Sequence, residues 1–269
     1  GVLKMKKLQI YVLATVWLSL LLISPAIALP IENNEDVIIR ATTSVYEFNN
    51  ISEKSIKFSG YEKTPHADYL IFYTNENEEY WVNTDSYEVE RYSAYSNYYN
   101  SMETVISREE AYSNAENFLS SHYNISNINQ YTLNGNLKNY GDVSIYEFIW
   151  REYIDDVEGF NCVNIEINPD NGKIASYIGL YRPYSVTFDN EISYEEAKSI
   201  VLSEFDDITD YQISGKLKIV YDDYKNQRLV WRIQLKSSKN IFGSFYYDDS
   251  QIIDIDAISG EIIRIDKML

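Results

Sequence analysis

The chain carries one composite motif twice, and this duplication constrains its fold more than any other feature. Ile106–Ala111 reads I-S-R-E-E-A, and Ile192–Ala197 repeats it as I-S-Y-E-E-A. After each copy comes a Trp-Arg pair and then an apolar segment with a Gly turn. These later parts are Trp150-Arg151 and Trp231-Arg232, followed by Ile167–Ile174 and Ile255–Ile262. The spacing between corresponding parts is unequal, which predicts loops of different length on one repeated scaffold.

Residues 1–28 have the order of a secretory signal peptide. Lysines precede an apolar run, and Ala26-Ile27-Ala28 forms a small-residue cleavage site. The alternative is an uncleaved anchor, because the stretch from Ile10 to Ala28 approaches the roughly 20 residues that a membrane span needs. Both interpretations predict an extracytoplasmic protein, which is either secreted or tethered to the membrane by this segment.

The composition is strongly acidic, with 41 Asp and Glu against 23 Lys and Arg and a net charge of −18. Such a field repels phosphate backbones and anionic lipids, so nucleic-acid binding is not expected. The charge suits a soluble exported domain, a salty environment or a basic partner. Cys162 is the only cysteine, so we expect folding without an internal disulfide and a buried or half-buried thiol in a strand.

Each I-S-x-E-E-A segment is predicted to begin a helix. Ser107 and Ser193 are followed three residues later by Glu110 and Glu196, which is the pattern of a capping box. Apolar residues then recur at helical spacing and give each helix one apolar face. They are Ala111, Ala115, Phe118 and Leu119 in the first helix and Ala197, Ile200, Val201 and Phe205 in the second.

Downstream of each helix, alternating apolar and polar residues predict antiparallel strands with one polar face. The clearest runs are Val163–Ile167, Leu229–Leu235 and Ile253–Ala257. Asn171-Gly172 and Ser259-Gly260 are predicted hairpin turns, in which Gly supplies positive φ. The expected fold is therefore α+β, with tandem modules at 104–187 and 188–269. Each module is one helix packed on an antiparallel sheet of about four strands.

Residues 29–103 are predicted to form an N-terminal β-rich unit, which is either a degenerate third copy or a hairpin extension. Val82–Val89 aligns with Ile167–Ile174, but Tyr87 takes the place of Gly172, so this turn is expected to differ. No I-S-x-E-E-A motif precedes these strands. Disorder is not expected beyond a short acidic stretch at 32–36.

Trp150 and Trp231 each lie in the middle of a predicted strand. We expect each indole to pack beneath the helix of its own module, near Ala111 or Ala197, as equivalent core anchors. The Arg that follows each Trp must then face the other side of the sheet. The competing interpretation makes the two indoles exposed ligand platforms on the open sheet face.

The helix start, the Trp-containing middle strand and the closing I-D-A-x-x-G-E-I hairpin together resemble the PepSY domain family. Ile255–Ile262 is the closer match, whereas Ile167–Ile174 departs from the pattern at Pro169 and Lys173. The resemblance covers about residues 104–268. It implies a helix on an antiparallel sheet, an exported or envelope location and a role in binding or restraining peptidases. It implies no catalytic residues.

The sequence contains no recognisable catalytic or cofactor-binding motif. His66 and His122 are its only histidines and cannot form an H-E-x-x-H zinc site, and no G-x-S-x-G elbow or C-x-x-C occurs. We expect His122 to cap a helix end and His66 to be exposed. Acidic pairs such as Asp155-Asp156 lack a calcium-loop pattern, so neither metal nor cofactor is predicted. Asn50 and Asn124 begin N-glycosylation sequons, which matter only if the source glycosylates exported chains.

These observations favour a non-catalytic protein. The first hypothesis is an exported binding module that engages, and thereby could inhibit, a peptidase, or that binds another envelope protein. The alternative is a structural cell-surface protein without specific ligand chemistry. An enzyme would require a pocket with converging carboxylates, for which the sequence gives no signal.

Overall fold

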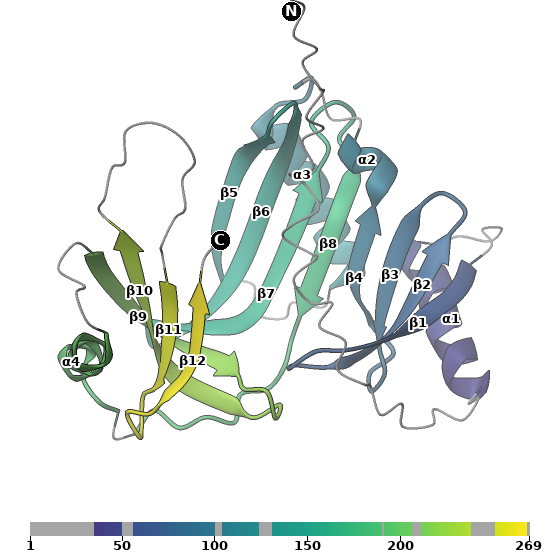
Figure 1. Cartoon of the computed structure of the whole chain (residues 1–269). Helices are drawn as coiled ribbons and strands as arrows, with labels where there is room; N and C mark the ends of the chain where they lie inside the picture. The colour runs from purple at the N-terminus through teal and green to yellow at the C-terminus, as the bar shows by residue number, and fades with distance from the viewer. Residues whose placement is uncertain are drawn as a thin grey trace, which may run out of the picture. The chain divides into compact units, whose positions relative to one another are not determined.

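A helix followed by four antiparallel strands is the recurring unit of the computed structural model (Figure 1). The structure describes residues 35–49, 56–99, 104–123, 131–189, 191–205, 211–237 and 251–267. The predicted signal peptide at 1–28 and the sequons at Asn50 and Asn124 lie outside the described residues. Of the helices that the structure describes, none is long and apolar enough to cross a membrane.

The recurring unit occurs three times in the described part of the chain. The first set is α1 (Glu35–Asn49), β1 (Ile56–Lys63), β2 (Asp68–Thr74), β3 (Glu78–Asn83) and β4 (Val89–Ala94). After the short α2 (Tyr95–Tyr99) come α3 (Arg108–His122), β5 (Tyr131–Tyr140), β6 (Val143–Ile154), β7 (Val157–Ile167) and β8 (Ile174–Leu180). The third set is α4 (Tyr194–Glu204), β9 (Tyr211–Tyr221), β10 (Gln227–Ser237), β11 (Gln251–Asp256) and β12 (Ile262–Lys267).

This element order confirms the α+β class. In the N-terminal region, too, a helix precedes the four strands, although the I-S-x-E-E-A motif is missing there. α1 begins at Glu35, so the helix includes the last two residues of the acidic stretch. The repeat boundaries at 29–103, 104–187 and 188–269 remain predictions.

One mixed sheet contains all twelve strands that the structure describes. Within each set, strands that follow one another in sequence pair antiparallel. β4 pairs with β8 in antiparallel fashion, and β7 meets β9 in parallel where Glu158 lies opposite Lys218. Residues 36–269 accordingly form one compact unit.

Both predicted helix starts are confirmed, and the capping box is complete at Ser193. The Ser193 hydroxyl accepts a hydrogen bond from the Glu196 amide, and the Glu196 carboxylate accepts one from the Ser193 amide, which completes the capping box. At α3 the Ser107 hydroxyl accepts a hydrogen bond from the Glu110 amide. These bonds satisfy amide groups that the first turn of a helix leaves without an intrahelical partner.

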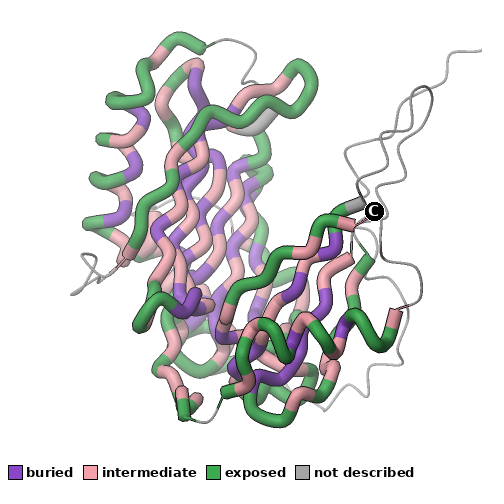
Figure 2. Tube along the Cα trace, turned by 90° about the vertical axis from the view of Figure 1, so that its left-hand side faces the viewer, coloured by how far each residue is buried: buried purple, intermediate pink, exposed green. Residues whose placement is uncertain are grey.

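Buried residues follow one side of the helices and the facing side of the strands (Figure 2). α1 and α3 share one core, which includes Ala41, Val45, Ala111, Ala115, Leu119, Phe72, Tyr80, Phe148, Val163 and Ile165. α4 covers a separate cluster of Ala197, Val201, Ile233, Leu235, Ile253 and Ile255. The small Ala side chains let each helix lie close to the sheet, as the spacing predicted.

Both indoles lie on the helix side of the sheet, so the interpretation as exposed platforms is wrong. Trp150 is 3% exposed and packs in the core that contains Ala111, with its ring stacked 6.2 Å from that of Tyr112. Trp231 is half-buried against the cluster that contains Ala197. Its Nε1 donates a hydrogen bond to the Ile192 carbonyl at 2.8 Å. The two anchors are therefore corresponding in place but unequal in burial.

The closing hairpin turn has the same hydrogen bonds in all three sets. Gly172 and Gly260 adopt φ of 71° and 74°, and their amides donate to the carbonyls of Asn168 and Asp256. The expectation that the Tyr87 turn differs is wrong, because Tyr87 adopts φ of 60° and its amide donates to the Asn83 carbonyl in the same way. The shared first residue, Asn or Asp, holds the turn by accepting backbone amides on its side-chain oxygen. This side-chain bond supports the left-handed conformation of Tyr87 without Gly.

In the second and third sets the turn also holds the start of the helix. The Ile106 amide donates to the Pro169 carbonyl, and the Ile192 amide donates to the Ala257 carbonyl. The carbonyls of the same two isoleucines accept side-chain bonds, from Tyr146 at 3.1 Å and from Trp231. The I-S-x-E-E-A motif and the closing hairpin motif thus contact each other directly. Where both motifs occur, they predict a helix that packs on its sheet.

We predict that Trp150→Ala lowers the free energy of unfolding by roughly 3–5 kcal/mol, because it leaves a cavity in the largest core. Trp231→Ala is expected to cost less, about 2 kcal/mol, since its indole is half-buried and part of the loss is one hydrogen bond. Urea denaturation followed by circular dichroism measures both values. Tyr224→Ala is the control, because Tyr224 is 85% exposed. Equal losses for all three variants would contradict the prediction.

Gly260→Ala is predicted to destabilise the chain by roughly 1–2 kcal/mol, because a side chain at positive φ is strained. The added Cβ would also lie 3.3 Å from Ile200 Cδ1. Gly60→Ala is the matched control, since its Cβ meets nothing within 4 Å. Thermal unfolding of the two variants compares them directly, and a Gly60→Ala variant that loses as much stability would argue against the role of this turn.

Candidate protein-binding face

The face of the third set that lies away from α4 is lined by charged side chains. Lys216 and Lys218 on β9 alternate with the apolar Leu217, and Arg232 on β10 follows the helix-facing Trp231. Arg232 lies directly opposite Lys216 on one side and Asp254 of β11 on the other. This placement agrees with the prediction that the Arg after each Trp faces away from the helix.

Three cations converge on one carboxylate where β7 meets β9. The side chain of Glu158 is only 6% exposed. Lys218 Nζ lies 2.6 Å and Arg151 Nε 3.6 Å from its Oε1, and Lys216 Nζ contacts Oε2. Together with Arg232 and Asp254, these residues are called the charged cluster below. The cluster joins β6 and β7 of the second set to β9, β10 and β11 of the third.

The charged cluster contains more positive than negative charge. Arg232 binds Asp254 through two hydrogen bonds of 2.7 Å each, and the Asp254 side chain is 1% exposed. Two carboxylates thus face four cations, which leaves a surplus of two positive charges. Lys216 and Arg232 are direct cross-strand neighbours, an arrangement that destabilises a sheet unless negative charge lies nearby. Such a surplus stands out in a chain whose net charge is −18.

The local environment fixes the charge state of these groups. Burial alone would raise the pKa of Glu158, but the hydrogen bonds from Lys216 and Lys218 outweigh it and hold this pKa below its usual value. Burial lowers the pKa of Lys218, an effect that the bond to Glu158 opposes. The paired hydrogen bonds to Asp254 raise the pKa of Arg232. The carboxylate of Glu158 is therefore ionised throughout the neutral range.

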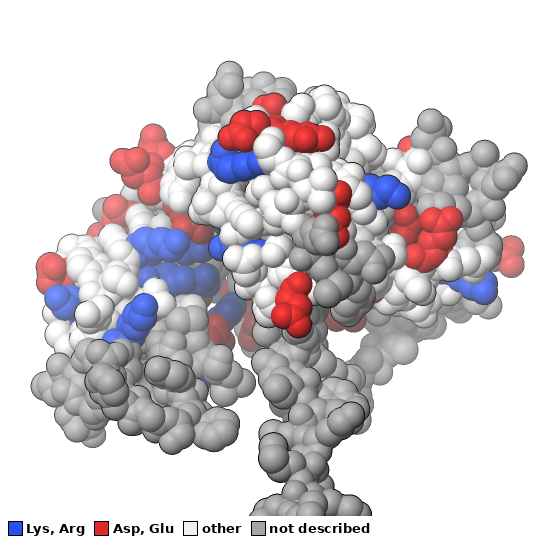
Figure 3. Space-filling model, turned by 90° about the horizontal axis from the view of Figure 1, so that it is seen from above, with Lys and Arg blue, Asp and Glu red and all other residues white. Residues whose placement is uncertain are grey.

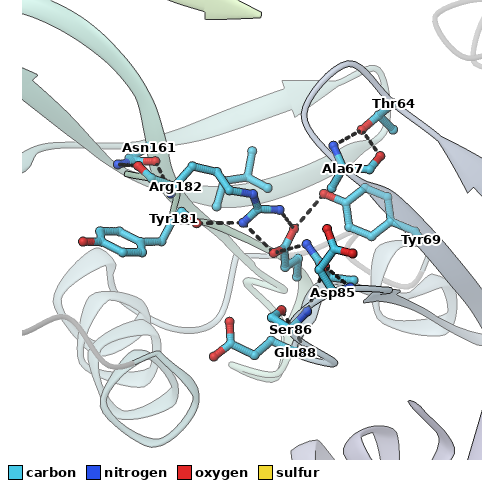
Figure 4. A network of polar contacts seen from close by, with 12 residues as sticks. Thr64, Ala67, Tyr69, Asp85, Ser86, Glu88, Asn161, Tyr181 and Arg182 are labelled. Atoms are coloured by element: carbon cyan, nitrogen blue, oxygen red, sulfur yellow. Dashed lines mark hydrogen bonds and ion pairs between the residues drawn. The ribbon is translucent and has the colours of Figure 1, made fainter. Parts of the chain in front are cut away.

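A second buried ion pair offers a useful contrast, because its charges balance (Figure 4). Arg182 binds both oxygens of Glu90, at 2.7 and 2.8 Å, and the Tyr69 hydroxyl donates to Glu90 at 2.7 Å. Asn161 holds the Arg182 backbone through its side-chain amide, at 2.8 and 3.0 Å. One cation, Arg182, pairs with one carboxylate, Glu90, so this network connects strands without a surplus of charge.

The space-filling view shows where the positive charge lies on the surface. Lys and Arg side chains gather in one compact group over the part of the molecule that contains β9–β12, to the left in Figure 3. The Lys216 side chain is 59% exposed, whereas that of Lys218 is 13% exposed. The surplus charge is therefore accessible from solvent, chiefly through Lys216.

The single-residue expectations have mixed outcomes. His122 caps the end of α3, as predicted, with Nδ1 2.8 Å from the Phe118 carbonyl oxygen. The expectation for His66 is wrong, because it is half-buried near Tyr69 and Tyr221, and its burial, with three cations nearby, lowers its pKa to about 4. Cys162 is half-buried as expected, and burial raises the pKa of its thiol. No group of three or more metal-ligating side chains occurs among the described residues.

Sequence reasoning missed the charged cluster as a whole. Two signals were present: the Arg residues after the tryptophans, and the alternation of Lys216 and Lys218 around Leu217. The position of Glu158 at their centre depends on the parallel contact between β7 and β9, which neither motif predicts.

We predict that Glu158→Gln destabilises the chain by about 3 kcal/mol. This value is at the low end for removal of one partner from a buried ion pair, because Lys216 is exposed to water and can be solvated without Glu158. The stabilisation by Glu158 is fully present above its usual pKa of 4.5 and is lost as the pH falls through its lower folded value. The stability difference between the wild type and the variant should therefore shrink below pH 4.5.

Denaturant titrations at a series of pH values measure this difference. Glu62→Gln serves as the control, because Glu62 is exposed on β1. A difference that stays constant as the solution is acidified would show that Glu158 contributes through its shape and not through its charge.

Comparison with known proteins supports part of the predicted family resemblance. Residues 191–266 match the model of the PepSY family, described as peptidase propeptide and YPEB domain. No curated protein matches the chain.

Two solved structures are similar at low identity. One is the YpeB C-terminal domain of Bacillus megaterium, with 17% identity, a TM-score of 0.44 and coverage of 87% of this chain and 97% of that one. The other is an uncharacterised protein from Eubacterium rectale, with 11% identity, a TM-score of 0.41 and coverage of 88% and 83%. The family model thus matches one of the two predicted copies, and the chain contains a PepSY domain at residues 191–266.

Proposed function

We propose that this chain is an extracytoplasmic, non-catalytic binding module that engages a peptidase or another envelope protein. The charged cluster on the face away from α4 is the observation that carries the proposal. In this role, the PepSY domain binds an acidic segment of the partner through the two surplus cations of that face. The leader-like sequence at 1–28 supports the extracytoplasmic location, and the family description supports a peptidase as the partner.

The geometry favours recognition of a carboxylate from outside. Three cations share the single carboxylate of Glu158. Because Lys and Arg each have several N–H donors, each cation can also donate a hydrogen bond to a further acceptor. A carboxylate of the partner next to Lys216 would neutralise part of the surplus and relieve the repulsion between Lys216 and Arg232. Electrostatic complementarity of this kind contributes to specificity and to the rate of association.

We predict that the mature chain binds one or more peptidases or envelope proteins from its own source and alters the activity of a bound peptidase. Co-purification and peptidase assays test this directly. Absence of both a complex and an activity change across that set would overturn the proposal. That outcome would favour the alternative of a structural surface protein.

The role of the face has its own test. Lys216→Glu should weaken binding of a fluorescein-labelled oligoglutamate peptide, and of any partner found, by roughly five- to ten-fold, and added salt should weaken the wild-type complex. Lys57→Glu is the matched control, because Lys57 is exposed on β1. Equal losses in the two variants would show that net charge, and not the charged cluster, is responsible.

A further inference from the structure

A cavity of about 490 Å³ lies between α1, the end of α3, the β3–β4 turn and β8. Its lining is rich in tyrosines and carboxylates and includes Glu47, Tyr87, Glu88, Tyr123, Tyr177 and Tyr181. It belongs to a different part of the chain from the charged cluster and shares no residue with it. It therefore concerns an interaction beyond the proposed function.

Tyr177 gives this cavity a polar group that is ready for a ligand. The residue is 1% exposed, and its hydroxyl has no hydrogen-bond partner among the described residues. A Cβ added at Gly179, which also lines the cavity, would lie 2.0 Å from this hydroxyl oxygen. The phenol thus reaches the cavity over a position that has no side chain. This oxygen is open to the cavity, so a ligand that enters can donate a hydrogen bond to it.

The other polar groups at the cavity are already engaged or negatively charged. Both ring nitrogens of His122 face carbonyl oxygens, of Phe118 at 2.8 Å and of Phe48 at 2.6 Å. Glu90 is neutralised by Arg182. Glu47 and Glu88 are exposed on the rim, and Figure 4 shows Glu88 beside Ser86 below Tyr181. The remaining charge of the residues that line the cavity is therefore negative.

The aromatic lining suits a flat cation. Tyrosine rings attract a guanidinium group over their faces, and this interaction is strongest where water is excluded. The structure already contains one example at this place, because the guanidinium carbon of Arg40 lies 5.8 Å from the centroid of the Tyr87 ring. An arginine side chain would combine stacking on tyrosines with a hydrogen bond to the Tyr177 oxygen and attraction to Glu88.

We infer that this cavity binds the guanidinium group of an arginine side chain presented by a peptide. Tyr177 accepts a hydrogen bond from it, the neighbouring tyrosines stack on its plane, and the rim carboxylates supply the opposite charge. The same arrangement discriminates against uncharged side chains of equal size.

Isothermal titration of the mature chain with acetyl-Gly-Arg-Gly-amide tests this inference. The citrulline peptide of the same sequence is the matched control, because it has almost the same shape without the charge. We expect measurable binding of the arginine peptide that salt weakens, with the citrulline peptide at least about ten-fold weaker. Failure of the arginine peptide to bind, or equal binding of both peptides, would overturn the inference.

Two isosteric variants locate the site. Tyr177→Phe removes only the hydroxyl and should raise the Kd of the arginine peptide by roughly five- to ten-fold, while leaving the free protein at least as stable. Glu88→Gln should raise it several-fold. Tyr224→Phe and Glu62→Gln are exposed controls and should leave it unchanged. An unaltered Kd in Tyr177→Phe would place the ligand elsewhere. Lys216→Glu changes only the charged cluster and is expected to leave the Kd of the arginine peptide unchanged.

Discussion

The hydrogen bond from the residue before the helix cap to the closing hairpin turn is the contact on which each of the last two helix-and-sheet sets depends. In the PepSY domain the Ile192 amide donates to the Ala257 carbonyl, and the Ile192 carbonyl accepts from Trp231. This fixes where the helix starts relative to the sheet, so that Ala197 faces the strands and not the solvent. Gly260 suits this turn because it adopts φ of 74° and because an added Cβ would lie 3.3 Å from Ile200 Cδ1 on the docked helix. The feature that the two sets share is thus the contact between the helix start and the closing hairpin turn. The loops in the rest of each set can differ in length.

The opposite face of the sheet is organised by charge. β7 and β9 share a single parallel pair of residues, so few backbone hydrogen bonds join the second and third sets there. Glu158 adds ion pairs to Lys216 and Lys218 across this joint. Buried ion pairs seldom add much stability compared with apolar packing, but they fix geometry, because a misplaced partner leaves an unpaired charge. We interpret the charged cluster as a set of ion pairs that fixes the position of β9 beside β7 and leaves positive charge accessible to solvent.

Much of the fold could be predicted from local signals. Ser193 with Glu196, the alternation through Trp231 and the Gly turns each depend on a few neighbouring residues, and the structure confirms them. The failures have tertiary causes. The Tyr87 turn keeps the geometry of a Gly turn because Asn83 holds it through side-chain bonds. His66 is half-buried because Tyr221, far away in sequence, packs beside it. The cavity and the charged cluster combine residues from different sets, which no single motif contains.

The two candidate sites differ in how much their charge indicates about the ligand that each would bind. In a chain of net charge −18, an acidic cavity agrees with the average composition, and the long-range field also favours the approach of basic peptides. The unpaired Tyr177 hydroxyl, not the carboxylates, is therefore the informative feature there. The charged cluster opposes the average field. The proposed acidic partner would therefore be recognised only at close range, within the roughly 8 Å over which charges act at physiological ionic strength. Glu158 and Asp254 balance two of the four cations in the free chain. Carboxylates of the proposed partner would balance the other two in a complex.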